Sequence, residues 1–414
     1  MLKLITPAAL KPRIASGDEI AVLDVRDEVA FAAGHILLAR SLPVSRVADS
    51  LAAFLPRASV PIVLVDDGDG LAARAERLLA EHGYTDLAAL DGGMAAWRDA
   101  GFGVFSGVNV PSKAFGEYVE ERFHTPSISA EELKAKRDAG EDLVILDSRP
   151  WTEYTRMNIP GGIDVPGAEL AYRVYDVAPS PRTLVVVNCA GRTRSIIGAQ
   201  SLINAGVPNR VVALRNGTMG WELAGYEVER GADRRAPEVS EAALARSRAA
   251  AAQVAVRYDV RKIDAAMLAQ FQREADKRSL YLFDVRNPEE YAAGHRPGSL
   301  SAPGGQLVQA TDRYVGALRA RLVLIDDTGV RATMTASWLR QMGWGDVFVL
   351  DRGLDGEMET GSGPAVGGYV SAALTTIDRA PDRKAAMREY LSWELGLIEA
   401  VEHDGTLRFP DFGA

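Results

Sequence analysis

The hydrophobic positions along the chain follow two patterns that alternate from the N-terminus to about residue 360. Short, almost continuous aliphatic runs such as 143–147 and 184–188 are typical of buried strands. After such a run come a polar turn and a stretch with apolar residues three or four positions apart, which predicts an amphipathic helix. Strands that alternate with helices in this way indicate βαβ units, in which helices cover both faces of a parallel sheet.

Three sequence phrases occur in the same order in three copies. The first is a strand ending in Asp-x-Arg, the second is a strand with a polar turn and a helix, and the third is a glycine-containing turn. The first phrase and the turn of the second are separated by 42 residues in each copy: Asp24 to Asp66, Asp147 to Cys189, and Asp284 to Asp326. The third-phrase glycines follow 27, 28 and 27 residues later: Gly93, Gly217 and Gly353. This constant spacing predicts three tandem α/β domains, each a small parallel sheet flanked by helices.

We expect these domains over residues 1–108, 117–232 and 258–362, with the Pro- and Gly-containing stretch 107–116 at the first junction. The second junction, 233–257, holds strong helix formers behind Ser240, which predicts a capped helix that spaces or braces the domains. The tail, 363–414, is predicted to hold an amphipathic helix whose apolar side chains need a surface to cover: Tyr390, Leu391, Trp393, Leu395 and Leu397. The sequence leaves open whether this helix docks on the domains or serves a homodimer.

Composition excludes several classes of protein. The chain has 414 residues, of which 47% are hydrophobic and 25% charged, as in an ordinary globular protein. A net charge of −9 and a pI near 5.3 argue against nucleic acid or an anionic membrane as a partner, because both require a basic surface. No apolar run has the length of a membrane helix, and the N-terminus lacks the apolar core of a signal peptide. We therefore expect a cytoplasmic protein.

Cys189 is the only cysteine in the chain, and it stands at the turn of the second phrase in the middle copy. The carboxyl ends of the strands face the functional crevice of an open α/β sheet, so the thiol is expected where ligands bind. The N–H groups of the turn and the start of the next helix, expected over 195–205, would form an anion site. With the charges of Arg192 and Arg194 beside it, we expect Cys189 to have a lowered pKa and to be a reactive nucleophile.

The first and third copies have an aspartate at the cysteine position. Asp66 and Asp326 cannot carry a transferred sulfur atom, so only the middle domain is expected to be active. Each carboxylate is expected to lie against the helix N-terminus that would otherwise hold a thiolate. The DDGDG turn at 66–70 lacks the ligand spacing of a calcium loop, and no metal or cofactor is expected.

Together these motifs resemble the rhodanese family of sulfurtransferases. The resemblance covers the Asp-x-Arg phrases, the Gly-His-Ile sequence 34–36, the cysteine turn, and the Gly-Gly or Asn-Gly phrase before a tryptophan. It implies that Cys189 takes the outer sulfur of a donor such as thiosulfate, carries it as a persulfide, and passes it to cyanide or a thiol. The expected substrate-binding residues are those that follow the cysteine, Ala190, Gly191, Arg192, Thr193, Arg194 and Ser195. Asp147 and Arg149 are expected to support the neighbouring strand end.

Loop length and sequence separate related activities on this framework. Cysteine phosphatases and arsenate reductases that resemble the family close a Cys-x5-Arg loop, whereas Arg194 closes a Cys-x4-Arg loop and Ser195 takes the phosphatase arginine position. Mercaptopyruvate-using relatives carry Gly-Ser/Thr-Gly after the cysteine, unlike this chain. Two-domain thiosulfate enzymes usually have basic residues where this chain has Gly191 and Glu153. Thiosulfate is still the favoured donor, because two guanidinium groups suit its oxygens. The main alternative is a persulfide relay or docking module fed by a partner protein.

Overall fold

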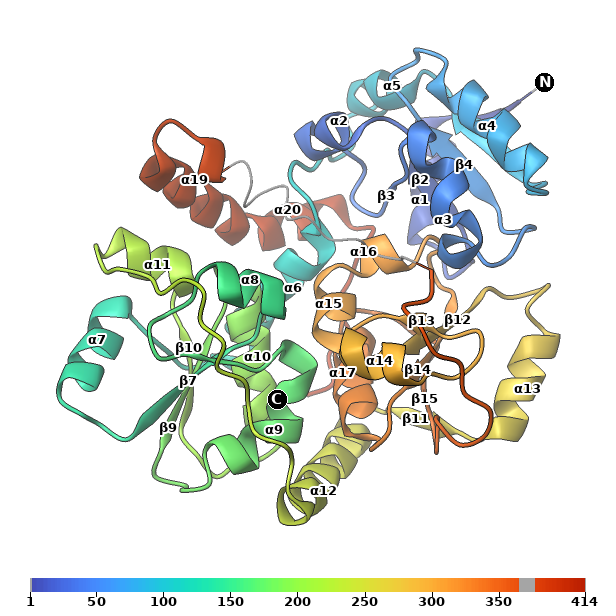
Figure 1. Cartoon of the computed structure of the whole chain (residues 1–414). Helices are drawn as coiled ribbons and strands as arrows, with labels where there is room; N and C mark the ends of the chain where they lie inside the picture. The colour runs from blue at the N-terminus through green and yellow to red at the C-terminus, as the bar shows by residue number, and fades with distance from the viewer. Residues whose placement is uncertain (1, 365–376, 414) are drawn as a thin grey trace.

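Three α/β domains joined by helices make up the computed structural model, which describes residues 2–364 and 377–413 (Figure 1). Each domain is built on a five-stranded parallel sheet, which confirms the predicted fold class. The strand order is the same in all three sheets: β1-β5-β4-β2-β3, β6-β10-β9-β7-β8 and β11-β15-β14-β12-β13. The repeated sequence phrases therefore correspond to a repeated topology.

The elements of the three domains follow the alternation expected from the hydrophobic pattern. The first domain contains β1 (Lys3–Ile5), α1 (Pro7–Ala15), β2 (Ala21–Asp24), α2 (Glu28–Ala33), β3 (Arg40–Ser41), the 3-10 helix η1 (Val44–Arg46), α3 (Val47–Phe54), β4 (Ile62–Val65), α4 (Leu71–Glu81), β5 (Leu87–Leu90) and α5 (Gly93–Asp99). The middle domain contains β6 (Ser127–Ile128), α7 (Ala130–Asp138), β7 (Leu143–Asp147), α8 (Trp151–Arg156), β8 (Ile163–Asp164), the 3-10 helix η2 (Gly167–Glu169), α9 (Leu170–Val177), β9 (Leu184–Asn188), α10 (Thr193–Asn204), β10 (Val211–Leu214) and α11 (Gly217–Leu223). The third domain contains β11 (Arg261–Ile263), α13 (Ala265–Arg273), β12 (Leu280–Asp284), α14 (Pro288–Ala293), β13 (Leu300–Ser301), α15 (Gly304–Gln309), α16 (Thr311–Tyr314), β14 (Arg321–Ile325), α17 (Val330–Gln341) and β15 (Val347–Leu350).

The sheet register brings the first two phrases of each copy together. In the middle domain all five residues of β9 are buried, as its aliphatic run predicts. Strand β7 pairs with β9 so that Asp147 lies opposite Asn188, the residue before Cys189. The Asp-x-Arg phrase and the cysteine turn consequently leave the sheet side by side. In the first and third domains the same pairing sets Asp24 and Asp284 opposite the last residues of β4 and β14.

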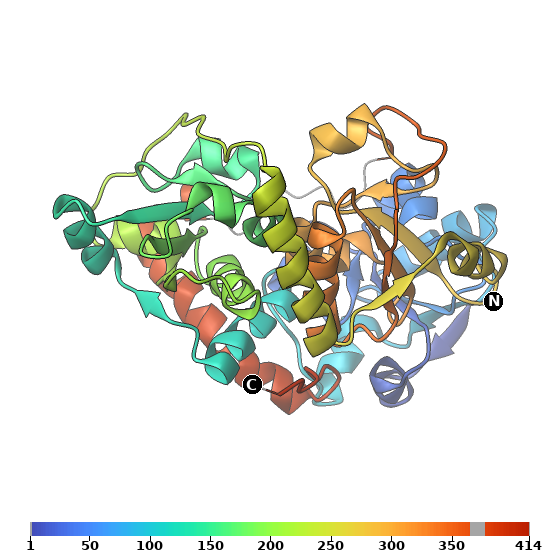
Figure 2. The ribbon, with the colours of Figure 1, turned by 90° about the horizontal axis from the view of Figure 1, so that it is seen from below.

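Two helices lie between the domains, of which one was predicted from the sequence and the other was not. Ser240 caps α12 (Glu241–Arg257) by accepting a hydrogen bond from the backbone of Ala243, as expected. This helix packs against α9 and α17 and braces the middle and third domains (Figure 2). Most of 107–116, expected as a junction, belongs instead to the buried helix α6 (Val110–Phe123). Pro111 lies in its first turn, where a missing N–H breaks no helical hydrogen bond.

The C-terminal segment docks back on the domains. It forms α19 (Arg383–Leu395) and α20 (Leu397–Asp404), which lie along α6, and α19 also contacts α11 (Figure 1). Leu391 and Leu397 are buried, whereas Leu395 is 56% exposed. The predicted need of this helix for a covering surface is thus met within the chain. Within the described residues, every helix is too short or too polar to cross a membrane.

Candidate active site

Cys189 follows β9 directly, and its loop runs into α10, which begins at Thr193, two residues earlier than expected. Residues of the third sequence phrase hold this loop by hydrogen bonds. The backbone and hydroxyl of Thr218 donate hydrogen bonds to the Cys189 carbonyl at 2.8 and 3.0 Å, and Met219 N–H donates to the Ala190 carbonyl at 2.9 Å. A Cβ atom on Gly217 would lie 2.3 Å from the Cys189 carbonyl oxygen, and the φ of Gly217 is +53°. This close approach explains why the third phrase needs a glycine.

Asp147 and Arg149 hold the neighbouring strand end. Arg149 binds both carboxylate oxygens of Asp147, at 2.8 and 2.6 Å, and donates a further hydrogen bond to the carbonyl of Met157. The carboxylate also accepts a hydrogen bond from Asn188 at 3.1 Å. The Asp24 and Asp284 phrases form the same bidentate pairs in the other domains. Because the arrangement recurs where no cysteine is present, it acts as support for the strand end.

The thiol of Cys189 is buried, with 2% of the residue exposed. Its Sγ lies 3.5 Å from Ser195 Oγ, and the Ser195 hydroxyl donates to the carbonyl of Arg192 at 2.8 Å. Burial raises the pKa of Cys189 above its ordinary value, and the charge of Arg194 and the hydrogen bonds from Ser195 offset this only in part. The expectation of a lowered pKa is therefore wrong for this arrangement. Removal of the thiolate from water outweighs the neighbouring positive charge.

The two loop arginines lie in different surroundings. Arg192 turns toward α6, where it binds Glu117 at 2.8 and 2.7 Å and also contacts Glu120. Its guanidinium is thus committed to these carboxylates, contrary to the expectation of two cations beside the sulfur. Arg194 binds Glu153 through two hydrogen bonds of 2.8 Å, and its charge lowers the pKa of Cys189. The other predicted loop residues, Ala190, Gly191, Thr193 and Ser195, are buried around the thiol.

Side chains from outside the middle domain cover the loop. A Cβ atom on Gly191 would lie 3.3 Å from Glu394 Oε2, 3.5 Å from Tyr390 Cε1 and 3.8 Å from Leu391 Cδ2, all on α19. Lys113 of α6 is buried beside Tyr390. No pattern in the sequence singled out Glu394 as a neighbour of the loop, or Lys113 as a neighbour of Tyr390. The amphipathic pattern of the C-terminal tail predicted that its apolar side chains cover a surface. No pattern in the sequence showed which surface that is.

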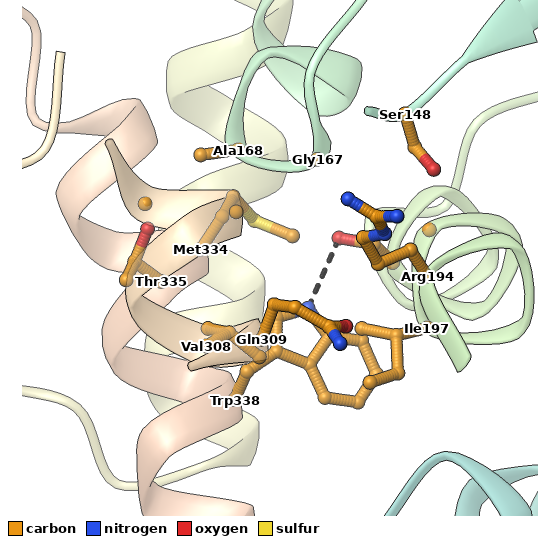
Figure 3. Close-up of a pocket in the computed structure, with 14 residues that line it drawn as sticks. Ser148, Gly167, Ala168, Arg194, Ile197, Val308, Gln309, Met334, Thr335 and Trp338 are labelled. Carbon is orange, nitrogen blue, oxygen red and sulfur yellow. Dashed lines mark hydrogen bonds between the residues drawn. The ribbon is translucent and has the colours of Figure 1, made fainter. Parts of the chain in front are cut away.

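The middle and third domains enclose two cavities. The smaller, of about 30 Å³, is lined by Ser148, Arg194 and Trp338 among others, and the indole of Trp338 donates a hydrogen bond across it to Ser201 (Figure 3). The larger, of about 340 Å³, lies next to it, since Ser148 lines both, and includes Trp151 and Asp164 in its wall. Burial raises the pKa of Asp164 to about 8. Cys189 lines neither cavity, so the third domain shapes the surroundings of the loop without opening the thiol.

The aspartates at the cysteine position lie as expected. Asp66 accepts hydrogen bonds from the N–H groups of Gly68 and Ala72, at 3.0 and 2.9 Å. Asp326 accepts from those of Gly329 and Arg331, at 2.7 and 2.9 Å. Both carboxylates lie in the loop against the start of a helix, where N–H groups point outward. The loop is an anion site in the two domains that lack the cysteine.

Comparison with known proteins identifies this repeated unit. A family model described as the rhodanese-like domain matches residues 6–100, 129–224 and 267–358. The crystal structure of a thiosulfate sulfurtransferase from Pseudomonas aeruginosa is 40% identical, covers 99% of both chains and superimposes with a TM-score of 0.90.

Curated relatives each match a fraction of the chain. The HTH-type transcriptional regulator Rv0324 of Mycobacterium tuberculosis is 34% identical over 106 residues, which are 26% of this chain and 46% of the regulator. The thiosulfate sulfurtransferase GlpE of Pseudomonas aeruginosa is 35% identical over 77 residues, 19% of this chain and 68% of GlpE. The chain thus spans about half the length of the first of these relatives.

Proposed function

We propose that this chain, which belongs to the rhodanese-like domain family, is a sulfurtransferase that moves sulfur from thiosulfate to a thiol or cyanide through a persulfide on Cys189. One observation carries the proposal. The equivalent loops of the first and third domains hold a carboxylate by their N–H groups, and the middle loop has a nucleophile at that position instead. Likeness over the whole chain to the Pseudomonas aeruginosa enzyme supports the choice of thiosulfate as donor.

The reaction has two half-reactions that both pass through Cys189. In the first, the thiolate attacks the outer sulfur of thiosulfate, a new S–S bond forms, and the S–S bond of thiosulfate breaks with its electron pair leaving on sulfite. In the second, the acceptor anion attacks the outer sulfur of the Cys189 persulfide, and the S–S bond breaks to regenerate the thiolate. In this proposal the N–H groups of the middle loop stabilise the thiolate and the persulfide anion, as those of Gly68 and Gly329 hold Asp66 and Asp326 in the other domains.

Arg194 and Ser195 are the side chains that adjust the charge on the sulfur. The Arg194 charge favours the thiolate from the side of the smaller cavity, while Glu153 holds its guanidinium in place. The Ser195 hydroxyl donates to the Arg192 carbonyl while the thiol is protonated, and can rotate to donate to the sulfur when the proton is lost.

Intact-mass measurement after incubation with thiosulfate tests the proposal. The full chain should gain the mass of one sulfur atom and release one sulfite, and cyanide should restore the original mass. Cys189→Ser should gain nothing, whereas Asp66→Ser and Asp326→Ser should gain sulfur as the wild type does. Loading only from a persulfidated partner protein would replace the proposal with a sulfur relay. Hydrolysis of an aryl phosphate or reduction of arsenate, without sulfur loading, would replace it with the phosphatase class.

A further inference from the structure

Lys113 is a buried cation without an ion pair in the part of the chain that the structure describes. It lies on α6 with 3% of its surface exposed, and no carboxylate of residues 2–364 and 377–413 is within 4.0 Å of its Nζ. The ammonium rests 4.8 Å from the ring centre of Tyr390 and 4.5 Å from that of Trp393. Aromatic faces attract a cation but offset only part of its lost hydration. The position therefore favours the approach of an anion.

Glu394 brings a carboxyl group to the same place from α19. The residue is 2% exposed, and its Oε1 accepts a hydrogen bond from the Tyr390 hydroxyl at 2.8 Å. Its Oε2 is buried without a hydrogen-bond partner among the described residues and lies 3.3 Å from where a Cβ of Gly191 would be. Buried polar oxygens without a partner are exceptions in native structures and call for an explanation. This oxygen lies over the apex of the cysteine loop.

The charges of Lys113 and Glu394 affect each other's pKa. Burial lowers the pKa of Lys113 to about 8, and the charge of Glu394 works against that shift. Burial likewise raises the pKa of Glu394, against the effect of Lys113 and of the Tyr390 hydroxyl. Lys113 and Glu394 thus each favour the charged form of the other, without an ion-pair contact between them.

The loop itself offers little charge to a donor anion. Arg192 is bound by Glu117 and Glu120, and Arg194 by Glu153. Position 191, between the cysteine and these arginines, is a glycine and contributes no charge. The space above that glycine is filled by Tyr390, Leu391 and Glu394 of α19, and Lys113 lies against the Tyr390 ring.

We propose that Lys113 binds the oxyanion end of the sulfur donor, and that Glu394 occupies this subsite until the donor displaces it. The inference rests on the proposed function and adds to it a donor subsite built from α6 and α19, outside the three repeats. The ligand class is a small sulfur donor with a sulfonate-like group. Thiosulfate would place its three oxygens toward Lys113 and its outer sulfur toward Cys189.

Lys113→Met gives the first test, because methionine fills the buried volume and removes the charge. Loss of a charge-assisted contact should raise the KM for thiosulfate by about 10- to 100-fold and leave kcat nearly unchanged. A singly charged organic thiosulfonate should lose less than thiosulfate does. Removal of a buried charge without an ion pair is not expected to unfold the protein, and thermal unfolding checks this. Lys384→Met, at an exposed position of α19, is the matched control and should behave as wild type.

Glu394→Gln gives the second test, because it keeps the shape and removes the competing charge. The KM for thiosulfate should fall by about threefold to tenfold. An unchanged KM in Lys113→Met, or a raised KM in Glu394→Gln, would overturn the inference while leaving the sulfurtransferase proposal intact.

A binding measurement separates the two proposals. In the Cys189→Ser background, calorimetric titration with thiosulfate should show binding that weakens on Lys113→Met. If the wild type fails to take up sulfur but this binding depends on Lys113, the proposed function fails and the anion subsite stands. If Lys113 makes no difference to binding, the subsite is refuted whatever the activity.

Discussion

The cysteine loop of the middle domain and the Asp326 loop of the third domain lie at the same place in their sheets. They differ in the group at the first position and in the backbone before the helix, where φ is −114° at Arg192 and +77° at the equivalent Gly329. In the third domain the Asp326 carboxylate accepts hydrogen bonds from the N–H groups of Gly329 and Arg331. In the middle domain the thiol of Cys189 takes the equivalent position beside Ser195. A carboxylate at this position occupies the N–H groups of the loop permanently. A thiol leaves these N–H groups available to an anion that forms during a reaction. The same position of the repeat can therefore stabilise the loop in one domain and take part in a reaction in another.

The arginine five residues after this position extends the comparison. Arg331 is fully buried and binds Glu290 and Asp327 as well as Glu169 of the middle domain. Arg194 keeps the equivalent glutamate, Glu153, but lies at the edge of a cavity. In the third domain this Arg–Glu pair helps to hold two domains together. In the middle domain the equivalent pair places a positive charge near the thiol.

The largest expected effect follows from making the middle loop like the third. Cys189→Asp should abolish sulfur transfer, a loss of about 10⁴-fold or more, because no persulfide can form. Its carboxylate should accept the loop N–H groups, so the free energy of unfolding should stay within about 1 kcal/mol of that of the wild type. Turnover with cyanide and urea denaturation measure the two quantities. A strongly destabilised Cys189→Asp would show that the loops are not equivalent anion sites.

The second effect falls on stability. Arg331→Met removes the buried cation that binds Glu169, Glu290 and Asp327. Because Glu169 keeps its ion pair with Arg173, the free energy of unfolding should fall by about 3 kcal/mol. Arg352→Met, which breaks an exposed pair with Asp355, should cost less than about 1 kcal/mol. Denaturant unfolding of both variants checks the difference. Equal costs would remove the distinction between the buried brace and a surface pair.

The third effect falls on reactivity. Arg194→Met removes the charge that lowers the pKa of Cys189, so the thiolate fraction at neutral pH should fall and alkylation by iodoacetamide should slow by about tenfold. The pH dependence of alkylation should move to higher pH. Arg194→Met/Glu153→Gln serves as the control, because it leaves no carboxylate unpaired. Alkylation rates that recover in the double variant would assign the effect to Glu153 and not to lost positive charge.

The sequence predicted what depends on local pattern and on repetition. The parallel sheets, the capped helix behind Ser240 and the place of Asp66 and Asp326 at a helix start follow from periodicity and spacing. The burial of the thiol and the direction of Arg192 depend on α6 and α19, which approach the loop from distant parts of the chain. A pKa set by desolvation depends on what covers the group, and no spacing in the sequence reveals that.

The smallest effect concerns Ser195. Its side chain lies beside the sulfur and has no counterpart in the loops of the first and third domains. Ser195 is six residues past the start of its loop, where the first and third domains have Ala72 and Ala332. Its hydrogen bonds lower the pKa of Cys189, so Ser195→Ala should raise that pKa, move the alkylation profile to higher pH and slow alkylation at neutral pH by about twofold to fivefold.

Ser148→Ala is the control for this variant. It also removes a buried hydroxyl, one that donates to the Asn188 carbonyl, but leaves the hydroxyl beside the sulfur in place. The profile of Ser148→Ala should match that of the wild type even if its stability falls by about 1 kcal/mol. Two variants with the same shift would mean that the rigidity of the strand ends, and not the hydrogen bond to sulfur, sets the reactivity of the middle loop.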